Sequence, residues 1–206
     1  SFTGEDSLSA TIDIGDVGSV VGGSDGLNFD ATSNKLQLDG LTYTFPLGGA
    51  TVMVGDSTDI SAVYTGACAY SAFTDYMGNC GTGSSVGLGN KGVTAAMSYA
   101  FDSGFSLAGG ISSSPAGIAT KEQDDAFGIE AAYTTDSWGL AVAYSDVEDT
   151  DTETTATSAT FWGVNGTYAF DFATLSAGFE SENPESGSDA TGFFVGLSFP
   201  EVGAGT

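Results

Sequence analysis

Several stretches of this sequence alternate strictly between bulky apolar residues and small or polar ones. In "WGLAVAY", Trp138, Leu140, Val142 and Tyr144 share one side and only Gly and Ala occupy the other. The same alternation recurs in "LSATIDI", "VTAAMSYAF", "FGIEAAY", "WGVNGTYAF" and "FFVGLSF". A period of two is typical of a β-strand with two unlike faces.

The small face of these strands limits the folds that are available. A β-sandwich fills its core with bulky side chains from the inner faces of both sheets, and the small face here supplies few of them. One bulky apolar face and one small, wet face is what a lipid-facing barrel around water requires.

The connections between the predicted strands alternate between short and long. Strand pairs are predicted within 35–56, 93–112, 126–145 and 160–181, with single strands near 8–16 and 191–199, about ten in all. Tight turns join the members of each pair, and long acidic segments separate the pairs, as in an up-and-down meander. The sequence therefore predicts an all-β, antiparallel, up-and-down transmembrane β-barrel, with 1–206 as a single barrel domain or the central part of one.

Aromatic residues form two rows along the predicted strands. One row lies beside the short turns (Phe45, Phe101, Phe105, Tyr133, Trp138, Tyr168, Phe170, Phe172, Phe199) and the other near the opposite strand ends (Phe127, Tyr144, Trp162, Phe179, Phe193). Aromatic side chains favour the two membrane interfaces. The alternative is that these are ordinary aromatic residues at the strand ends of a sandwich.

Closure and register add two expectations. A sheet in hydrocarbon cannot leave an edge unpaired, so the strands either close alone or belong to a larger, roughly 16-stranded barrel. Because the chain ends on a turn, "PEVGAGT", we expect a fragment with strands missing on both sides. A change of parity at Asp39–Gly40 predicts a glycine-marked bulge or a strand start there.

The charge balance excludes several classes of protein. The formal net charge is -24, with three Lys and no Arg or His. Such a chain repels nucleic acid, and a Ser–His catalytic pair cannot be built within it, so we expect no enzyme. No Lys or Arg lies inside a predicted strand, which predicts a weak preference for cations. A solvated acidic surface explains the charge equally well.

The candidate functional residues lie on the small face and in one long loop. The predicted pore-lining residues are Asp13, Thr94, Ser98, Glu130, Asn165, Thr167 and Ser198. Segment 57–90 either folds inward, with Tyr70, Phe73, Asp75 and Tyr76 at a constriction, or forms an external loop. Within it, Cys68 and Cys80 form a disulfide, which implies an oxidising compartment, or remain free thiols.

No cofactor is expected. The carboxylates of "DVEDTDTE" (Asp146–Glu153) are candidate calcium ligands, but the stretch lacks the spacing and glycine of an EF-hand, so a solvated acidic loop is favoured.

Three segments carry a resemblance to a known family. "SFTGEDSL" (Ser1–Leu8), "LTYTFPLGGATVMVGD" (Leu41–Asp56) and "FFVGLSFPEVGAGT" (Phe193–Thr206) resemble segments of cyanobacterial outer-membrane porins of the carbohydrate-selective porin family. The resemblance implies a barrel in the outer membrane, often a homotrimer in contact with lipid, that passes small solutes and inorganic ions. It also implies an S-layer-homology domain, which this sequence does not contain. The acidity suggests a marine member.

A second class of protein stays open at this point. An acidic, β-rich extracellular surface module, such as an adhesin or S-layer module, shares the composition and the disulfide. Such a module needs neither aromatic rows nor alternating loop lengths.

Overall fold

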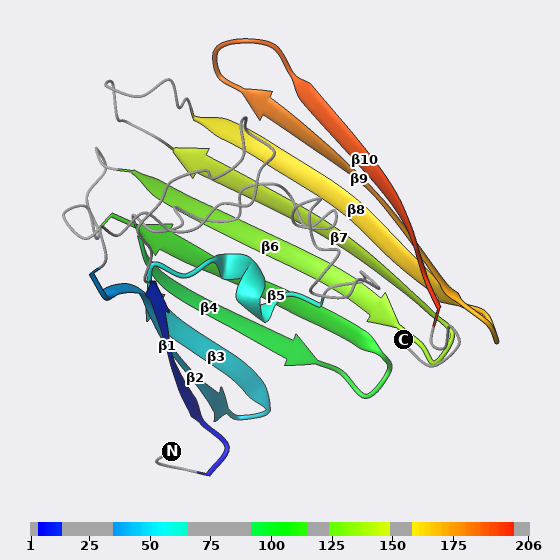
Figure 1. Ribbon diagram of the computed structural model, residues 1–206, viewed down its shortest axis with the longest axis horizontal. Coiled ribbons are helices and arrows are strands. Elements are labelled where there is room, and N and C mark those ends of the chain that lie inside the picture. The colour runs from blue at the N-terminus through cyan, green and yellow to red at the C-terminus, as the bar shows by residue number, and fades with distance from the viewer. Residues whose placement is uncertain (1–3, 14–34, 66–91, 115–123, 149–157, 200–206) are drawn as a thin grey trace.

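The chain forms one antiparallel sheet of ten strands that follow one another in sequence order, from β1 to β10. Figure 1 shows it in the computed structural model, which describes residues 4–13, 35–65, 92–114, 124–148 and 158–199. The first five strands are β1 (Ser7–Asp13), β2 (Gln37–Leu47), β3 (Ala50–Asp56), β4 (Val93–Ala100) and β5 (Phe105–Ser113). The others are β6 (Asp125–Thr134), β7 (Trp138–Glu148), β8 (Ala159–Ala169), β9 (Thr174–Pro184) and β10 (Ala190–Ser198).

Short turns join β2 to β3, β4 to β5, β6 to β7 and β8 to β9, as predicted. The first turn shows why its residues are glycines: Gly48 and Gly49 have φ of 59° and 87°. Two consecutive residues with positive φ make a type I′ hairpin turn, whose twist matches that of the flanking strands.

The predicted bulge is confirmed by the register of β1 on β2. Thr11 pairs with Gly40 and Ile12 pairs with Leu38, so Asp39 is the extra residue. The bulge restores the parity that the sequence loses at Asp39–Gly40, and side chains on both sides of it return to their proper faces.

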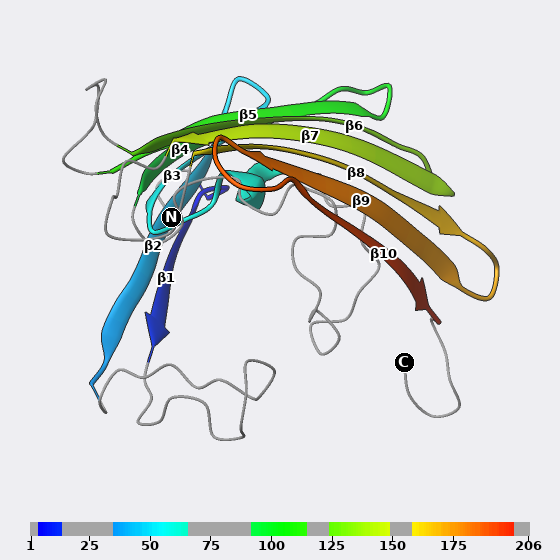
Figure 2. The same cartoon turned by 90° about the horizontal axis from the view of Figure 1, so that it is seen from above.

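The sheet is a single curved layer rather than half of a sandwich. Seen from above in Figure 2, its strands form an arc, and a four-residue 3-10 helix, η1 (Ile60–Val63), lies in the hollow. This confirms the all-β, up-and-down, barrel-like architecture. No helix within the described part of the chain is long and apolar enough to cross a membrane.

Most of the bulky apolar side chains of the strands lie on the convex face and are exposed. The exposed fraction is 52% for Met97, 49% for Val142 and 70% for Val195. Their neighbours of opposite parity, such as Ala96, Ala141 and Ala143, are buried. The predicted division of the strands into two unlike faces is therefore confirmed, and no second layer of described residues covers the bulky face.

Within each of the two predicted aromatic rows, rings on neighbouring strands contact each other. Beside the short turns, Tyr133 and Trp138 have ring centroids 5.4 Å apart. Near the opposite strand ends, Trp162 and Phe179 are separated by 5.2 Å. Such tilted pairs stabilise the strand ends on the convex face.

Candidate functional site

The chain enters the hollow immediately after β3. Ser57 has φ of 53°, in the left-handed region that non-glycine residues rarely adopt, and its N–H donates to the carbonyl of Gly92 at 3.0 Å. At Gly55 an added Cβ would lie 2.5 Å from the Thr58 methyl group and 2.9 Å from the Leu41 carbonyl oxygen. Glycine at this position therefore allows the segment 57–65, which we call the inner segment, to fold back against the sheet.

Apolar packing holds η1 on the concave face. Asp59 caps the helix by accepting the N–H of Ser61 at 2.8 Å. Ile60 is fully buried against Met53 of β3 and Ala96 of β4, and Val63 and Tyr64 pack around them. This cluster is the hydrophobic core of the described residues, and it lies between the inner segment and the wall.

Polar side chains of the wall bind the inner segment directly. The Thr94 hydroxyl donates to the Thr58 carbonyl at 2.7 Å and lies 3.0 Å from the Ser112 hydroxyl. Glu130 of β6, which is 3% exposed, accepts the backbone N–H of Thr65 at 2.6 Å. The inner segment is thus tied to β4 near its start and to β6 at its end.

The contact at Thr65 includes a second hydrogen bond and an unmatched oxygen. The Thr65 hydroxyl lies 3.0 Å from that of Ser106 on β5. The second carboxylate oxygen of Glu130 is buried and has no hydrogen-bond partner among the described residues. Because one oxygen of this buried carboxyl group is already without a partner, loss of the hydrogen bond on the other oxygen is costly.

Tyr64 precedes Thr65 in the inner segment and packs against the cluster of Met53, Ile60 and Ala96. Its hydroxyl is buried without a hydrogen-bond partner in the part of the chain that the structure describes. Burial raises the pKa of Tyr64, and the negative charges of Glu130 and Asp59 raise it further. The phenol therefore stays neutral over the ordinary range of pH.

The predicted pore-lining residues alternate onto the concave face, but they differ in access. Asp13, Ser98, Thr167 and Ser198 are half-buried. Thr94, Glu130 and Asn165 are 0%, 3% and 1% exposed. Thr94 and Glu130 therefore support the inner segment instead of facing open solvent. The predicted constriction residues (Tyr70, Phe73, Asp75, Tyr76) and the two cysteines, Cys68 and Cys80, lie outside the described residues.

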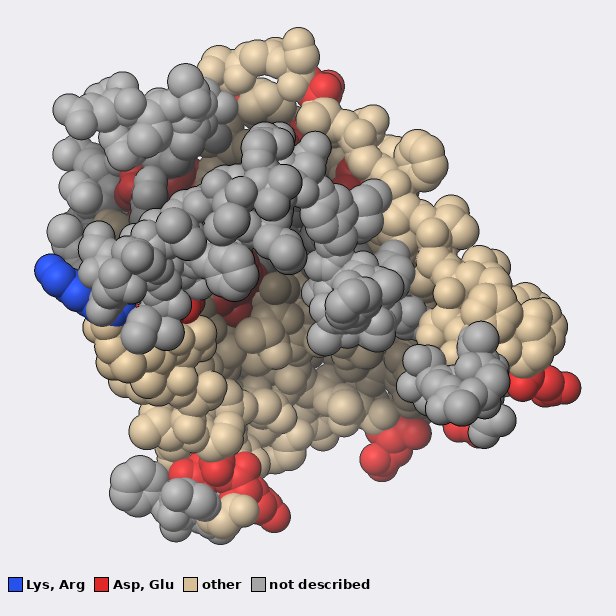
Figure 3. Space-filling model, viewed as in Figure 1, with Lys and Arg blue, Asp and Glu red and all other residues tan. Residues whose placement is uncertain are grey.

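Two further carboxylates share this face and were not among the residues predicted from the sequence. Glu180 and Glu182 of β9 have the parity of Ser176, opposite to the outward Phe179. The alternation of residues in "LSAGFESE" could have predicted that both carboxylates lie on this face. Figure 3 looks into the hollow and shows acidic groups inside it and at its rim.

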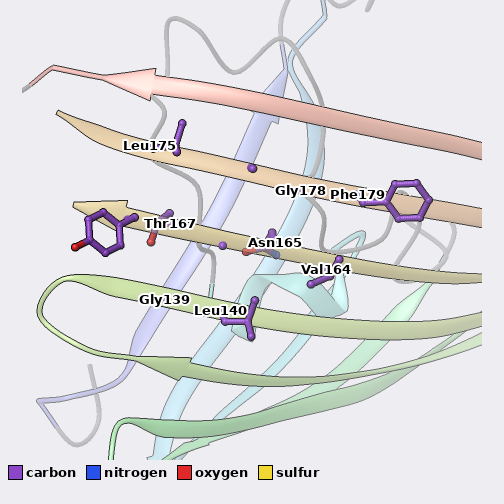
Figure 4. Close-up of a pocket in the computed structure, with 11 residues that line it drawn as sticks. Gly139, Leu140, Val164, Asn165, Thr167, Leu175, Gly178 and Phe179 are labelled. Atoms are coloured by element: carbon purple, nitrogen blue, oxygen red, sulfur yellow. The ribbon is translucent and has the colours of Figure 1, made fainter. Parts of the chain in front are cut away.

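A hollow of about 510 Å³ lies on the other, convex face. Figure 4 shows the residues around it, including Leu140 of β7, Val164 of β8, and Leu175 and Phe179 of β9. Gly166 pairs with Ala177 at its floor. Because both residues are small, they leave a gap among the larger outward side chains. The lining is mostly apolar and includes the outward Leu140, Val164 and Phe179, so this hollow belongs to the outward surface and not to the concave site.

Among the described residues, no group of three His, Cys, Asp or Glu side chains is placed to hold a metal ion. Of the predicted calcium loop, Asp146–Glu148 belong to β7 and residues 149–153 lie outside the described ranges. Calcium binding there stays a prediction.

Known proteins offer limited similarity to this chain. No protein-family model and no curated protein matches the sequence. Among solved structures the chain is similar to two mutants of a Rhodobacter blastica porin, at 15% and 16% identity with TM-scores of 0.43 and 0.42. These matches cover 84% and 82% of this chain and 71% and 70% of the porin chains. Likeness at this level carries no functional argument, so the function is inferred from the two faces of the sheet and from the inner segment.

Proposed function

We propose that this chain forms the wall of a water-filled outer-membrane porin channel that lets small solutes and inorganic ions diffuse passively. The observation that supports the proposal is the exposure of the bulky face. Phe193 is 80% exposed, Val195 70% and Ile111 64%, and they belong to a continuous set that covers most strands. Soluble proteins rarely leave so large an apolar surface uncovered, whereas a bilayer covers it.

The edges of the sheet favour a larger assembly. In the described sheet β1 and β10 each have one neighbour, and a strand edge in hydrocarbon leaves backbone groups without partners. We therefore propose that additional strands complete a barrel of roughly 16 strands, a size that leaves an aqueous channel. The inner segment lies on the wall of that channel.

The charges on the concave face favour cations. Glu180 and Glu182 point to this side, and no strand of the described sheet contains Lys or Arg. The described lysine, Lys35, precedes β2, and Figure 3 shows the basic group at one margin of the hollow. Fixed negative charge along a wide aqueous path produces weak cation selectivity.

The resemblance of the strand-and-turn segments extends the proposal. We place the protein in the outer membrane of a marine cyanobacterium, as a homotrimer surrounded by lipid, with sugars among the solutes that pass. Cross-linking in detergent, followed by electrophoresis without heating, tests the trimer. A monomer alone would limit the proposal to a single barrel.

Reconstitution of the full-length protein tests the central claim. The protein should require detergent for extraction and should conduct in a planar bilayer. In a KCl gradient its reversal potential should have the sign of cation preference. Extraction without detergent, together with no conductance, would favour the acidic surface module instead.

A further inference from the structure

A carboxylate and an aromatic ring lie next to each other on the concave face of β9 and β10. Glu180 pairs in register with Gly192 on one side and with Gly163 on the other. Both in-register neighbours of Glu180 are thus glycines. Phe194, two residues beyond Gly192, is the diagonal neighbour of Glu180, at a distance that aromatic and long side chains can bridge.

The ring of Phe194 lies across the backbone of β9. An added Cβ at Gly178 would lie 2.2 Å from Cε1 of Phe194, so the ring occupies the space above this glycine. Glu180 is two residues further along the same face. Glu180, Gly192, Phe193 and Phe194 line a cavity of about 140 Å³. The ring and the carboxylate thus border one small hollow on the proposed channel wall.

This pair of groups suits a particular class of solute. An ammonium or guanidinium group can pair with the carboxylate and at the same time contact the ring through its π-face or its alkyl stem. A potassium ion in the same channel gains mainly from the carboxylate. We propose that Glu180 and Phe194 form a subsite for organic cations, and this inference rests on the proposed channel function.

A purely structural role for Phe194 leads to a different expectation. An aromatic ring can simply cover a glycine on a neighbouring strand and so stabilise the sheet. Leucine also covers Gly178, but it has no π-face. The variant Phe194→Leu therefore keeps the cover and removes only the feature that distinguishes organic cations from potassium.

The test measures block of the potassium current by L-arginine through the full-length protein in planar bilayers. We expect Phe194→Leu to raise the blocking constant about twofold to fivefold, the size of an exposed cation–π contact, with the K⁺/Cl⁻ preference unchanged. Glu180→Gln should weaken both the block and the cation preference. Phe127→Leu, which alters a ring on the convex face, should leave both unchanged.

Two results would overturn the subsite. One is equal block of the wild type and Phe194→Leu, and the other is block that is insensitive to Glu180→Gln. Both leave the channel proposal intact, because they are measured on a conducting protein. Absence of KCl conductance in the wild type would instead contradict the proposed function itself.

Discussion

Glu130 should control how firmly the inner segment is held against the wall. Its carboxylate accepts the Thr65 N–H at 2.6 Å in a site where the side chain is 3% exposed. In Glu130→Ala this N–H loses its acceptor. A buried N–H left without an acceptor costs about 1–3 kcal/mol, and the cavity left behind adds to that cost.

Such a loss should appear in single-channel recordings. A change of about 1–3 kcal/mol corresponds to a population of released inner segment that is roughly 5- to 150-fold larger. Because Thr94 and Ile60 still anchor the start of the segment, we expect larger current fluctuations around the open level rather than a permanent change of conductance. Excess open-channel noise in Glu130→Ala is the expected signature.

A matched variant separates the hydrogen bond from the charge. Glu130→Gln retains an oxygen acceptor for the Thr65 N–H, so its noise should stay close to that of the wild type and its stability within about 1 kcal/mol. Thermal unfolding in detergent monitors folding of all three proteins. If Glu130→Ala is as quiet as the wild type while both fold, the anchor does not act as described.

Three further predictions concern residues of the inner segment and of the two faces of the sheet. Ile60→Ala should destabilise the inner segment by about 2–5 kcal/mol, seen as faster proteolysis after β3, because Ile60 is fully buried. Met97→Lys on the convex face should cost about 2–4 kcal/mol on unfolding from lipid vesicles, whereas Ser98→Lys on the concave face should cost little; equal costs would contradict the lipid-facing assignment. Burial raises the pKa of Tyr64 above its ordinary value of 10.0. The neutral phenol therefore stabilises the packed inner segment fully below pH 10.0, and this stabilisation is lost as the pH rises further. Tyr64→Phe should remove this alkaline loss, measured as channel noise against pH.

Local sequence patterns predicted the sheet because the alternation within each strand shows which of its two faces is apolar. The alternation at Trp138–Tyr144 and the parity change at Asp39–Gly40 are properties of a few consecutive residues. Both are confirmed by the exposure of Leu140 and Val142 and by the register at Thr11 and Ile12. The short turns were equally local, since glycine at 48 and 49 is required by positive φ.

The inner segment depends on contacts that no local pattern contains. Thr65 and Glu130 are 65 positions apart, and the Met53–Ile60–Ala96 cluster joins three separate stretches. The sequence holds two weak signals: a capping Asp59 before an isolated Ile60, and Gly55, which leaves space beside β3. Strand alternation predicted that Glu130 lies on the concave face, but it could not predict that the inner segment covers this residue.

The meander also fixes an order of assembly. Each of the nine strand ladders joins neighbours in the chain, so hairpins can be added one after another with small loop-closure cost. The Thr65 N–H, by contrast, acquires its acceptor only when β6 has joined the growing sheet. During biogenesis the inner segment should therefore rest loosely on β3 and β4, and it should become fixed at its far end only after β6 has joined the sheet.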